Sequence, residues 1–200
     1  FFCGCGGLMT INPVLTIDRT KNELIPLPQP DELFYLRRDG VKFDCVLPGS
    51  AGKLKASGVC VLSSTRIVFI AKEKTANRAD FGSFEIPFGR DVGGLVNPQF
   101  KQPIFGANYL QGEVQCAQFG GGTAKASLTF TSGGCDTFLQ NFFRVFGEAQ
   151  LQGQAAPFSA GFRQNPQHTA FVDPNDPSVL YISQPTPSAP PLDTTTTGTQ

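Results

Sequence analysis

The chain has 200 residues, 40% of them hydrophobic, and its 16 Lys and Arg residues balance its 16 Asp and Glu residues. This length suits one domain with added segments, and 19 Phe residues supply ample apolar area for a core. Zero net charge gives the whole chain no strong field toward nucleic acid, so we expect no nucleic-acid partner.

Residues 1–31 are predicted to form an extended lead-in, because the prolines between residues 13 and 30 disfavour a helix. Cys3 and Cys5 lie in the sequence Phe-Phe-Cys-Gly-Cys-Gly-Gly and are candidates for lipidation. The alternative is a leader that carries no modification. Neither cysteine has His or Cys partners at metal-ligand spacing, so we expect no metal site and no cofactor.

Residues 32–150 are predicted to form one domain that is mainly β. Val41–Val46 begins as an alternation of apolar and polar residues, which is typical of a strand. Lys53–Leu62 and Thr65–Lys72 are two further β-rich runs, joined across Ser63 and Ser64 as a hairpin. Arg66–Ile70 is almost continuously apolar, which favours a central position in the sheet.

Phe81–Phe88 predicts another strand, with Pro87 at its edge because proline cannot donate to a central ladder. Lys101–Leu110 predicts a bent strand that enters a small β-structure. Here Pro103 fixes one backbone angle, and Gly106 permits a close approach of the backbone. We expect Phe105 and Tyr109 to contribute buried aromatic area.

An antiparallel pair and a helix complete the predicted domain. Leu110–Cys116 and Ala124–Phe130 both alternate with period two, on either side of the turn at Gly120–Gly122. Phe138, Phe142 and Phe146 then recur every fourth residue, which predicts an amphipathic helix over residues 135–150. An apolar stripe this wide has to be covered, so the helix is expected to close one end or face of the sheet.

Cys45, Cys60, Cys116 and Cys135 are isolated, and most of them lie in apolar β-like runs, so we interpret them as reduced structural thiols. Residues 151–200 are rich in proline and poor in charge. Such a segment buries too little apolar surface to offset its conformational entropy. We therefore predict a flexible or partner-held tail.

Several separated segments resemble, in the same order, the GRAM domain of the WW-domain-binding protein 2 family. They are Arg66–Lys72, Ile86–Phe88, Lys101–Leu110, Leu128–Gly134 and, in the tail, Asp173–Pro177. The resemblance implies a pleckstrin-homology-like (PH-like) roll of antiparallel strands, capped by one C-terminal helix, that binds proteins or phosphoinositides. It also implies a proline-rich tail that recruits WW domains through Pro-Pro-x-Tyr motifs.

The tail departs from that family pattern at its one comparable site. Pro190-Pro191-Leu192-Asp193 has an aspartate where the motif requires tyrosine, which argues against binding to a WW domain. The neighbouring residues Pro187, Ser188, Ala189 and Pro190 resemble a short peptide motif that is read by ESCRT-I ubiquitin-variant domains. Four residues of this kind also occur by chance in a proline-rich tail.

The first half of the predicted domain holds a basic cluster on adjoining strands and loops. Its members are Lys53, Lys55, Arg66, Lys72, Lys74 and Arg78. Together they form a candidate site for an anionic lipid headgroup, while the alternative is a solvated charged surface.

The chain has one histidine, His168, in the tail, and no nucleophile, base and metal-ligand constellation, so no enzymatic activity is expected. We predict a non-enzymatic adaptor that binds proteins and, as a further expectation, phosphoinositide. The alternative is a structural subunit of a large assembly in which both arms are ordered by neighbours. A cytoplasmic location is expected, with peripheral membrane or nuclear locations as alternatives.

Overall fold

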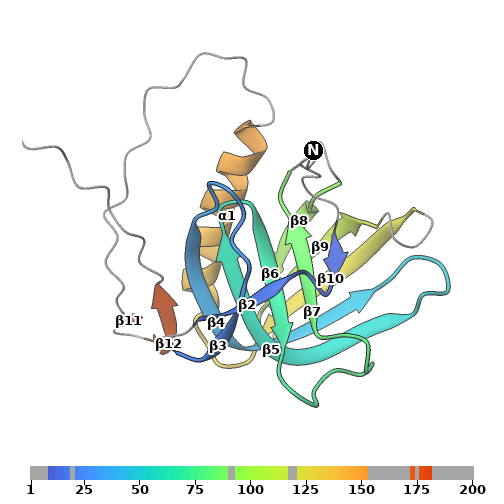
Figure 1. Ribbon diagram of the computed structural model, residues 1–200, viewed down its shortest axis with the longest axis horizontal. Helices are drawn as coiled ribbons and strands as arrows, with labels where there is room; N and C mark the ends of the chain where they lie inside the picture. Colours follow the sequence, from blue (N-terminus) through green and yellow to red (C-terminus); the bar gives the residue numbers. More distant parts are fainter. Residues whose placement is uncertain are drawn as a thin grey trace, which may run out of the picture.

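The computed structural model describes residues 9–18, 21–89, 93–116, 121–152, 172–173 and 176–181. Within these ranges the chain is mainly antiparallel β with one helix near its C-terminal end, which confirms the predicted fold class (Figure 1). The strands are β1 (Thr10–Ile11), β2 (Leu15–Asp18), β3 (Glu23–Pro26), β4 (Phe34–Val46), β5 (Lys53–Ser63), β6 (Arg66–Ala71), β7 (Ser83–Pro87), β8 (Val96–Lys101), β9 (Tyr109–Gln115), β10 (Thr123–Phe130), β11 (Val172–Asp173) and β12 (Asp176–Tyr181). The helix is α1 (Cys135–Gln152).

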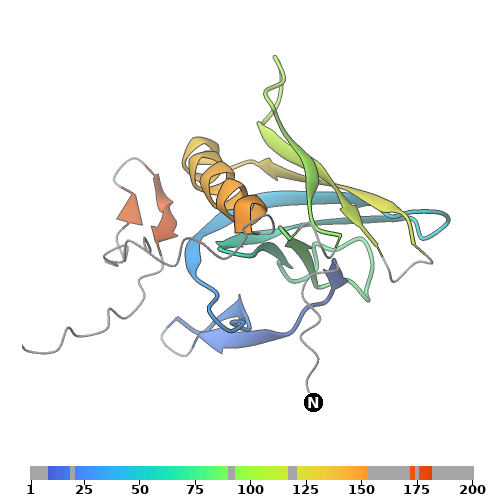
Figure 2. The same cartoon turned by 90° about the horizontal axis from the view of Figure 1, so that it is seen from above.

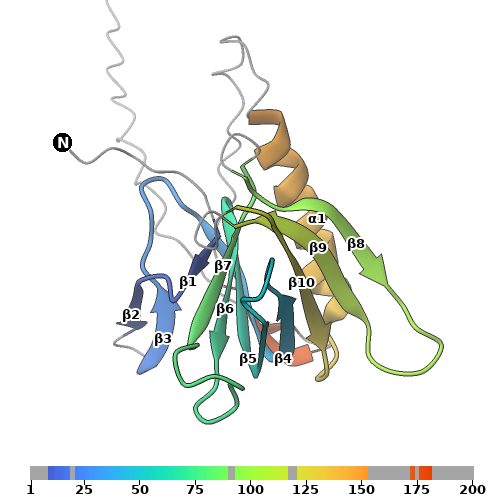
Figure 3. The same ribbon diagram turned by 90° about the vertical axis from the view of Figure 1, so that its right-hand side faces the viewer.

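One bent sheet forms the body of the molecule, with the strand order β1-β7-β6-β5-β4-β10-β9-β8. Most neighbours in this order are consecutive in the sequence and pair as antiparallel hairpins, and the predicted β5–β6 and β9–β10 pairs are both confirmed. The β2–β3 hairpin is a separate small sheet. It lies on the opposite side of the molecule from the β8–β9 hairpin (Figures 2 and 3).

Strand β4 changes its partner along one edge. Residues 41–46 pair with β10, whereas residues 36–38 pair with β12, and the other edge of β4 pairs with β5 throughout. Gly40 lies at the change, with φ +67° and no room for a side chain against Ser132. Its carbonyl accepts hydrogen bonds from the backbone and hydroxyl of Thr131, at 2.9 and 2.6 Å. The bend in β4 therefore holds the turn that leads into α1.

The phenylalanine stripe of α1 closes the roll, as its spacing predicts. Phe138 and Phe142 are fully buried. Phe138 lies 4.9 Å, centroid to centroid, from Phe130 at the end of β10, while Phe142 lies 5.8 Å from Phe88 just after β7. The helix thus bridges two strand ends that are distant in the sheet order. A second aromatic group, centred on Phe43 of β4, fills the interior farther from α1.

The predicted lead-in contributes more to the fold than an extended arm does. Met9 is buried in the main core, and β1 pairs with the outer edge of β7. Leu15 of β2 packs on the outer face of the sheet against a small cluster formed by Val61, Val68 and Ile70. A two-residue strand is too short to show a period, so the sequence pattern missed β1. The division of the chain at residue 31 stays a prediction.

The structure contradicts the expected burial of Phe105. This side chain is 92% exposed, and its neighbour Ile104 is 95% exposed, because both lie in the loop between β8 and β9. Tyr109 is half-buried, at the start of β9. The aromatic residues of Lys101–Leu110 are therefore not all part of the core. The run is also not one bent strand, because β8 ends at Lys101 and β9 begins at Tyr109, with a loop between them.

Part of the predicted tail is ordered as strands. β11 and β12 pair with each other, and β12 adds to β4. The helix also extends two residues beyond the predicted boundary at residue 150. The other residues of the tail lie outside the described part of the chain.

Candidate functional site

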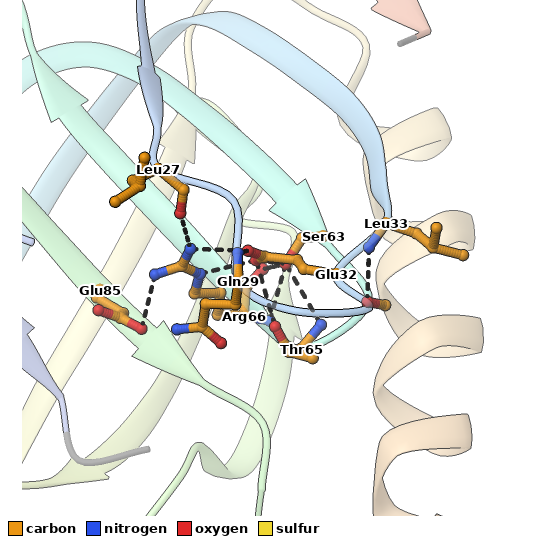
Figure 4. A network of polar contacts seen from close by, with 9 residues as sticks. Leu27, Gln29, Glu32, Leu33, Ser63, Thr65, Arg66 and Glu85 are labelled. Atoms are coloured by element: carbon orange, nitrogen blue, oxygen red, sulfur yellow. Dashed lines mark hydrogen bonds and ion pairs between the residues drawn. The ribbon is translucent and has the colours of Figure 1, made fainter. Parts of the chain in front are cut away.

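The sequence assigns Arg66 to a lipid-binding surface, and the structure shows that this assignment is wrong. Its side chain is only 5% exposed and lies against the fully buried carboxylate of Glu32. Nε and one terminal nitrogen of the guanidinium donate to the two carboxylate oxygens at 2.7 and 2.8 Å. Another nitrogen donates to Glu85 of β7 at 3.1 Å (Figure 4). Arg66 therefore cannot reach a ligand at the surface.

The carboxylate of Glu32 accepts further hydrogen bonds. The hydroxyls of Ser63 and Thr65 donate to Glu32 at 2.6 and 3.2 Å, and the backbone N–H of Gln29 donates at 2.8 Å. Burial alone raises the pKa of Glu32, but the hydrogen bonds from Arg66, Ser63 and Gln29 outweigh it, so the pKa lies below its usual value. A carboxylate held ionised in this way is a weak proton acceptor. The hydrogen bonds to Glu32 instead link the segment before β4 to the β5–β6 turn.

The loop between β6 and β7 is clamped onto the beginning of β5. The Asn77 side chain accepts from the N–H of Lys55 at 2.7 Å and donates to the carbonyl of Lys53 at 3.0 Å. The Thr75 hydroxyl donates to the carbonyl of Ser57 at 2.6 Å. These side chains imitate a neighbouring strand, so the loop has a fixed position beside β5.

This clamp brings together lysines from two parts of the chain. Cross-strand partners share a face, so Lys55 lies opposite Asp44 and Ser57 lies opposite Lys42 on the outer face of β4 and β5. The backbone N–H of Lys72 continues the ladder by donating to the carbonyl of Ser57 at 2.8 Å. We name this surface the basic face, and it consists of the exposed residues Lys42, Lys53, Lys55, Lys72 and Lys74.

Sequence reasoning missed Lys42, although the alternation of β4 turns it outward between the buried Val41 and Phe43. Among the described residues, Lys53, Lys72 and Lys74 have no ion-pair partner. Lys55 differs, because its ammonium group lies 2.9 Å from the carboxylate of Asp44. The clamped loop also carries the exposed Glu73 between Lys72 and Lys74, so the basic face has an excess of positive charge that this carboxylate partly offsets.

Arg78 is the last member of the predicted cluster, and its charge is already paired. Its guanidinium contacts both carboxylate oxygens of Asp80, at 2.9 and 2.6 Å. This contact raises the pKa of Arg78 and lowers that of Asp80. A third hydrogen bond reaches the carbonyl of Ala51 in the β4–β5 loop at 3.3 Å. Arg78 therefore ties two loops together at the border of the basic face.

A hollow of about 660 Å³ adjoins the basic face, on the outer side of β4, β10, β9 and β8. Its lining is polar and carries both signs of charge, with Asp44, Glu113 and Lys125 among its residues. The Lys125 ammonium lies 3.9 Å from Glu113. Because two carboxylates face one ammonium group, the hollow itself does not favour an anion.

The remaining predicted sites lie outside the described residues: Cys3 and Cys5, and the peptide motif Pro187–Pro190. In the part of the chain that the structure covers, no cluster of His, Cys, Asp and Glu has the geometry of a metal site. No helix in that part is long and apolar enough to span a bilayer. Cys45, Cys60, Cys116 and Cys135 are free and buried, which confirms the prediction of structural thiols.

Comparison with known proteins identifies the family, although no family model matches the chain. WW domain-binding protein 2 of Homo sapiens is 32% identical over 130 residues, which cover 64% of this chain and 46% of that protein. A UPF0664 stress-induced protein of Schizosaccharomyces pombe is 30% identical over 146 residues, covering 71% of this chain and 79% of its own length. The chain belongs to the WW domain-binding protein 2 family.

Membership of the WW domain-binding protein 2 family confirms the resemblance seen in the sequence. The chain matches about half the length of the mammalian relative. The postacrosomal sheath WW domain-binding protein of Macaca fascicularis is also similar, with 35% identity over 86 residues, 42% of this chain and 31% of that protein.

Proposed function

We propose that this chain is a non-enzymatic adaptor whose GRAM-type roll engages phosphoinositide headgroups through the basic face while other surfaces dock protein partners. The concentration of unpaired lysines around the clamped β6–β7 loop is the observation that carries the lipid part of this proposal. Such a module acts at the cytoplasmic surface of a membrane.

Three features support the choice of an anionic headgroup as ligand. Asn77 and Thr75 donate to the backbone carbonyls of Lys53 and Lys72, at 3.0 and 2.7 Å, so the backbone that carries these two lysines is held before a ligand arrives. A lysine near an anionic membrane surface contributes about 1 kcal/mol of binding free energy. Several phosphates on one small ring also satisfy more than one ammonium group at once.

The protein-docking part of the proposal rests on the family. Its relatives carry names that describe binding to WW domains. In this chain, the candidate motif has Asp193 in place of the required tyrosine. We therefore propose that the roll and the tail bind protein partners, and we do not propose a WW domain as the partner.

Isothermal titration calorimetry with soluble inositol 1,4,5-trisphosphate tests the lipid part. We expect saturable binding by the whole chain, weakened about fivefold by Lys72→Ala and again by Lys74→Ala. Lys21→Ala is the matched control, because Lys21 is an exposed lysine next to β3 and away from the basic face. Equal losses for Lys21→Ala and Lys72→Ala, or no binding at all, would refute headgroup recognition by the basic face.

A further inference from the structure

The loop between β8 and β9 presents an apolar tip that the fold does not use. The last cross-strand pairs before the loop are Phe100 with Leu110 and Lys101 with Tyr109. Beyond them, Ile104 and Phe105 are 95% and 92% exposed. These are the most exposed large apolar side chains in the described part of the chain.

The base of this hairpin is rigid, although its tip is exposed. Leu110 is buried in the main core, and Phe100 packs against the same core. At the tip, Gly106 has φ +111°, a conformation that other residues rarely adopt, and it lets the chain reverse direction. The hairpin therefore holds two apolar side chains away from the body of the molecule, as the views in Figures 2 and 3 show for its ribbon.

We propose that this tip inserts Ile104 and Phe105 into the interfacial layer of an anionic lipid bilayer. The proposal deepens the proposed function, because it rests on the basic face meeting the same membrane. In Figure 3 the tip of the β8–β9 hairpin and the loop between β6 and β7, which carries Lys74, both point toward the lower side of the molecule. Both segments therefore face the same side of the molecule.

Charge favours a bilayer over a protein groove as the occupant. Lys101 is the one charged residue in the sequence from residue 96 to residue 112, so the tip of the hairpin carries no carboxylate to repel an anionic leaflet. Glu113 lies at the other end of the hairpin, where it pairs with Val96 at the start of β8. Gln102 and Asn108, on either side of the tip, are polar side chains suited to the headgroup level. A convex tip also enters a fluid layer without needing a preformed pocket, and apolar burial there follows the area removed from water.

The chain contains no Trp, so a single introduced tryptophan reports on one place. In Phe105→Trp we expect the emission of the indole to shift to the blue on phosphatidylcholine vesicles with 20% phosphatidylserine and 2% phosphatidylinositol bisphosphate. Brominated acyl chains in those vesicles should quench it. Leu151→Trp is the control, because Leu151 is 68% exposed at the C-terminal end of α1, which points away from the lower side (Figure 1).

A second variant measures how much the tip contributes. Ile104→Ser combined with Phe105→Ser should weaken vesicle partitioning about tenfold, while its melting temperature stays that of the parent because both side chains are exposed. Titration with soluble inositol trisphosphate separates this inference from the proposed function. Headgroup binding that survives in the double variant, together with weaker partitioning, supports insertion.

Three results overturn the inference. The first is indole emission of the Phe105→Trp variant that does not change on vesicles that do bind the protein. The second is partitioning that is equal in the double variant and the parent. The third is a blue shift of the Phe105→Trp indole emission that a protein partner produces and that vesicles do not. In each case the titration with inositol trisphosphate still decides the proposed function by itself.

Discussion

Glu32 and Arg66 form a bidentate ion pair, with N–O distances of 2.7 and 2.8 Å, although 34 positions separate them in the sequence. Both side chains are almost completely removed from water. The pair joins the segment that precedes β4 to the first residue of β6, and Glu85 of β7 joins it from a third element. Arg66, which the sequence assigned to ligand binding, thus has a structural role.

Replacing Glu32 tests this role. Glu32→Gln should lower the free energy of unfolding by about 3 kcal/mol, because it leaves a buried guanidinium with part of its charge uncompensated. Urea denaturation measures the loss. Glu148→Gln removes the exposed pair with Arg144 and should change stability by no more than about 0.5 kcal/mol. Equal effects of the two substitutions would show that the buried pair adds nothing.

The pH dependence of stability follows from the same carboxylate. The pKa of Glu32 in the folded chain lies below its ordinary value of 4.5, so the ionised form stabilises the fold above about pH 4.5. That contribution is lost as the pH falls through the folded-state pKa. The stability difference between the parent and Glu32→Gln should therefore shrink in acid below pH 4.5. A difference that grows in acid would reverse the assigned sign.

The helical closure of the roll depends on Phe142. This ring is fully buried and contacts Phe88, Phe138 and Phe146. Phe142→Ala should cost about 3–5 kcal/mol of unfolding free energy. Phe143 is the natural control, since it is the next residue on α1 and 44% exposed. If chemical denaturation gave the same loss for Phe142→Ala and Phe143→Ala, the packing described for α1 would be wrong.

Two glycines should respond to alanine in opposite ways. Gly147 lies within α1 and has open space around it, so Gly147→Ala should stabilise the chain by about 0.5–1 kcal/mol. At Gly58 of β5, a side chain would collide with the carbonyl of Ile70, so Gly58→Ala should destabilise by about 1–3 kcal/mol. Thermal unfolding of both variants checks the two signs, and a stabilised Gly58→Ala would contradict the register of β5 and β6.

The buried thiols should be inert in the folded chain. Burial raises the pKa of Cys45 to about 12 and that of Cys135 to about 11, so almost no thiolate is present at pH 8. The experiment uses a chain with Cys3→Ser and Cys5→Ser, which leaves the four described cysteines. Ellman's reagent should modify them only after urea is added. Fast modification of the native chain would show that the core is open.

The sequence predicts the local elements well because strand and helix periods are local. Phe138, Phe142 and Phe146 identify α1, and the alternation on either side of the glycine turn identifies β9 and β10. Pairings between distant residues leave no such pattern. Nothing near Arg66 in the sequence shows that Glu32 and Glu85 surround it, so its absence from the basic face could not be predicted.

The exposure of Phe105 illustrates a second limit. An aromatic residue in a run that resembles a strand is usually buried, and only the end of the β8–β9 pairing shows that Phe105 lies beyond the last cross-strand pair. Lys42 is the converse case. The alternation of β4 already turns it outward, but its place beside the clamped loop depends on the hydrogen bonds of Lys72 and Asn77.

The proposed function requires the basic face to be the surface that meets an anionic headgroup. Chemical-shift mapping on the isotope-labelled chain, titrated with inositol 1,4,5-trisphosphate, tests it directly. We expect the largest changes at the amides of residues 53–57 and 72–78, with little change around Glu113 in the neighbouring hollow. Changes centred on the hollow, or none anywhere at saturating ligand, would contradict it.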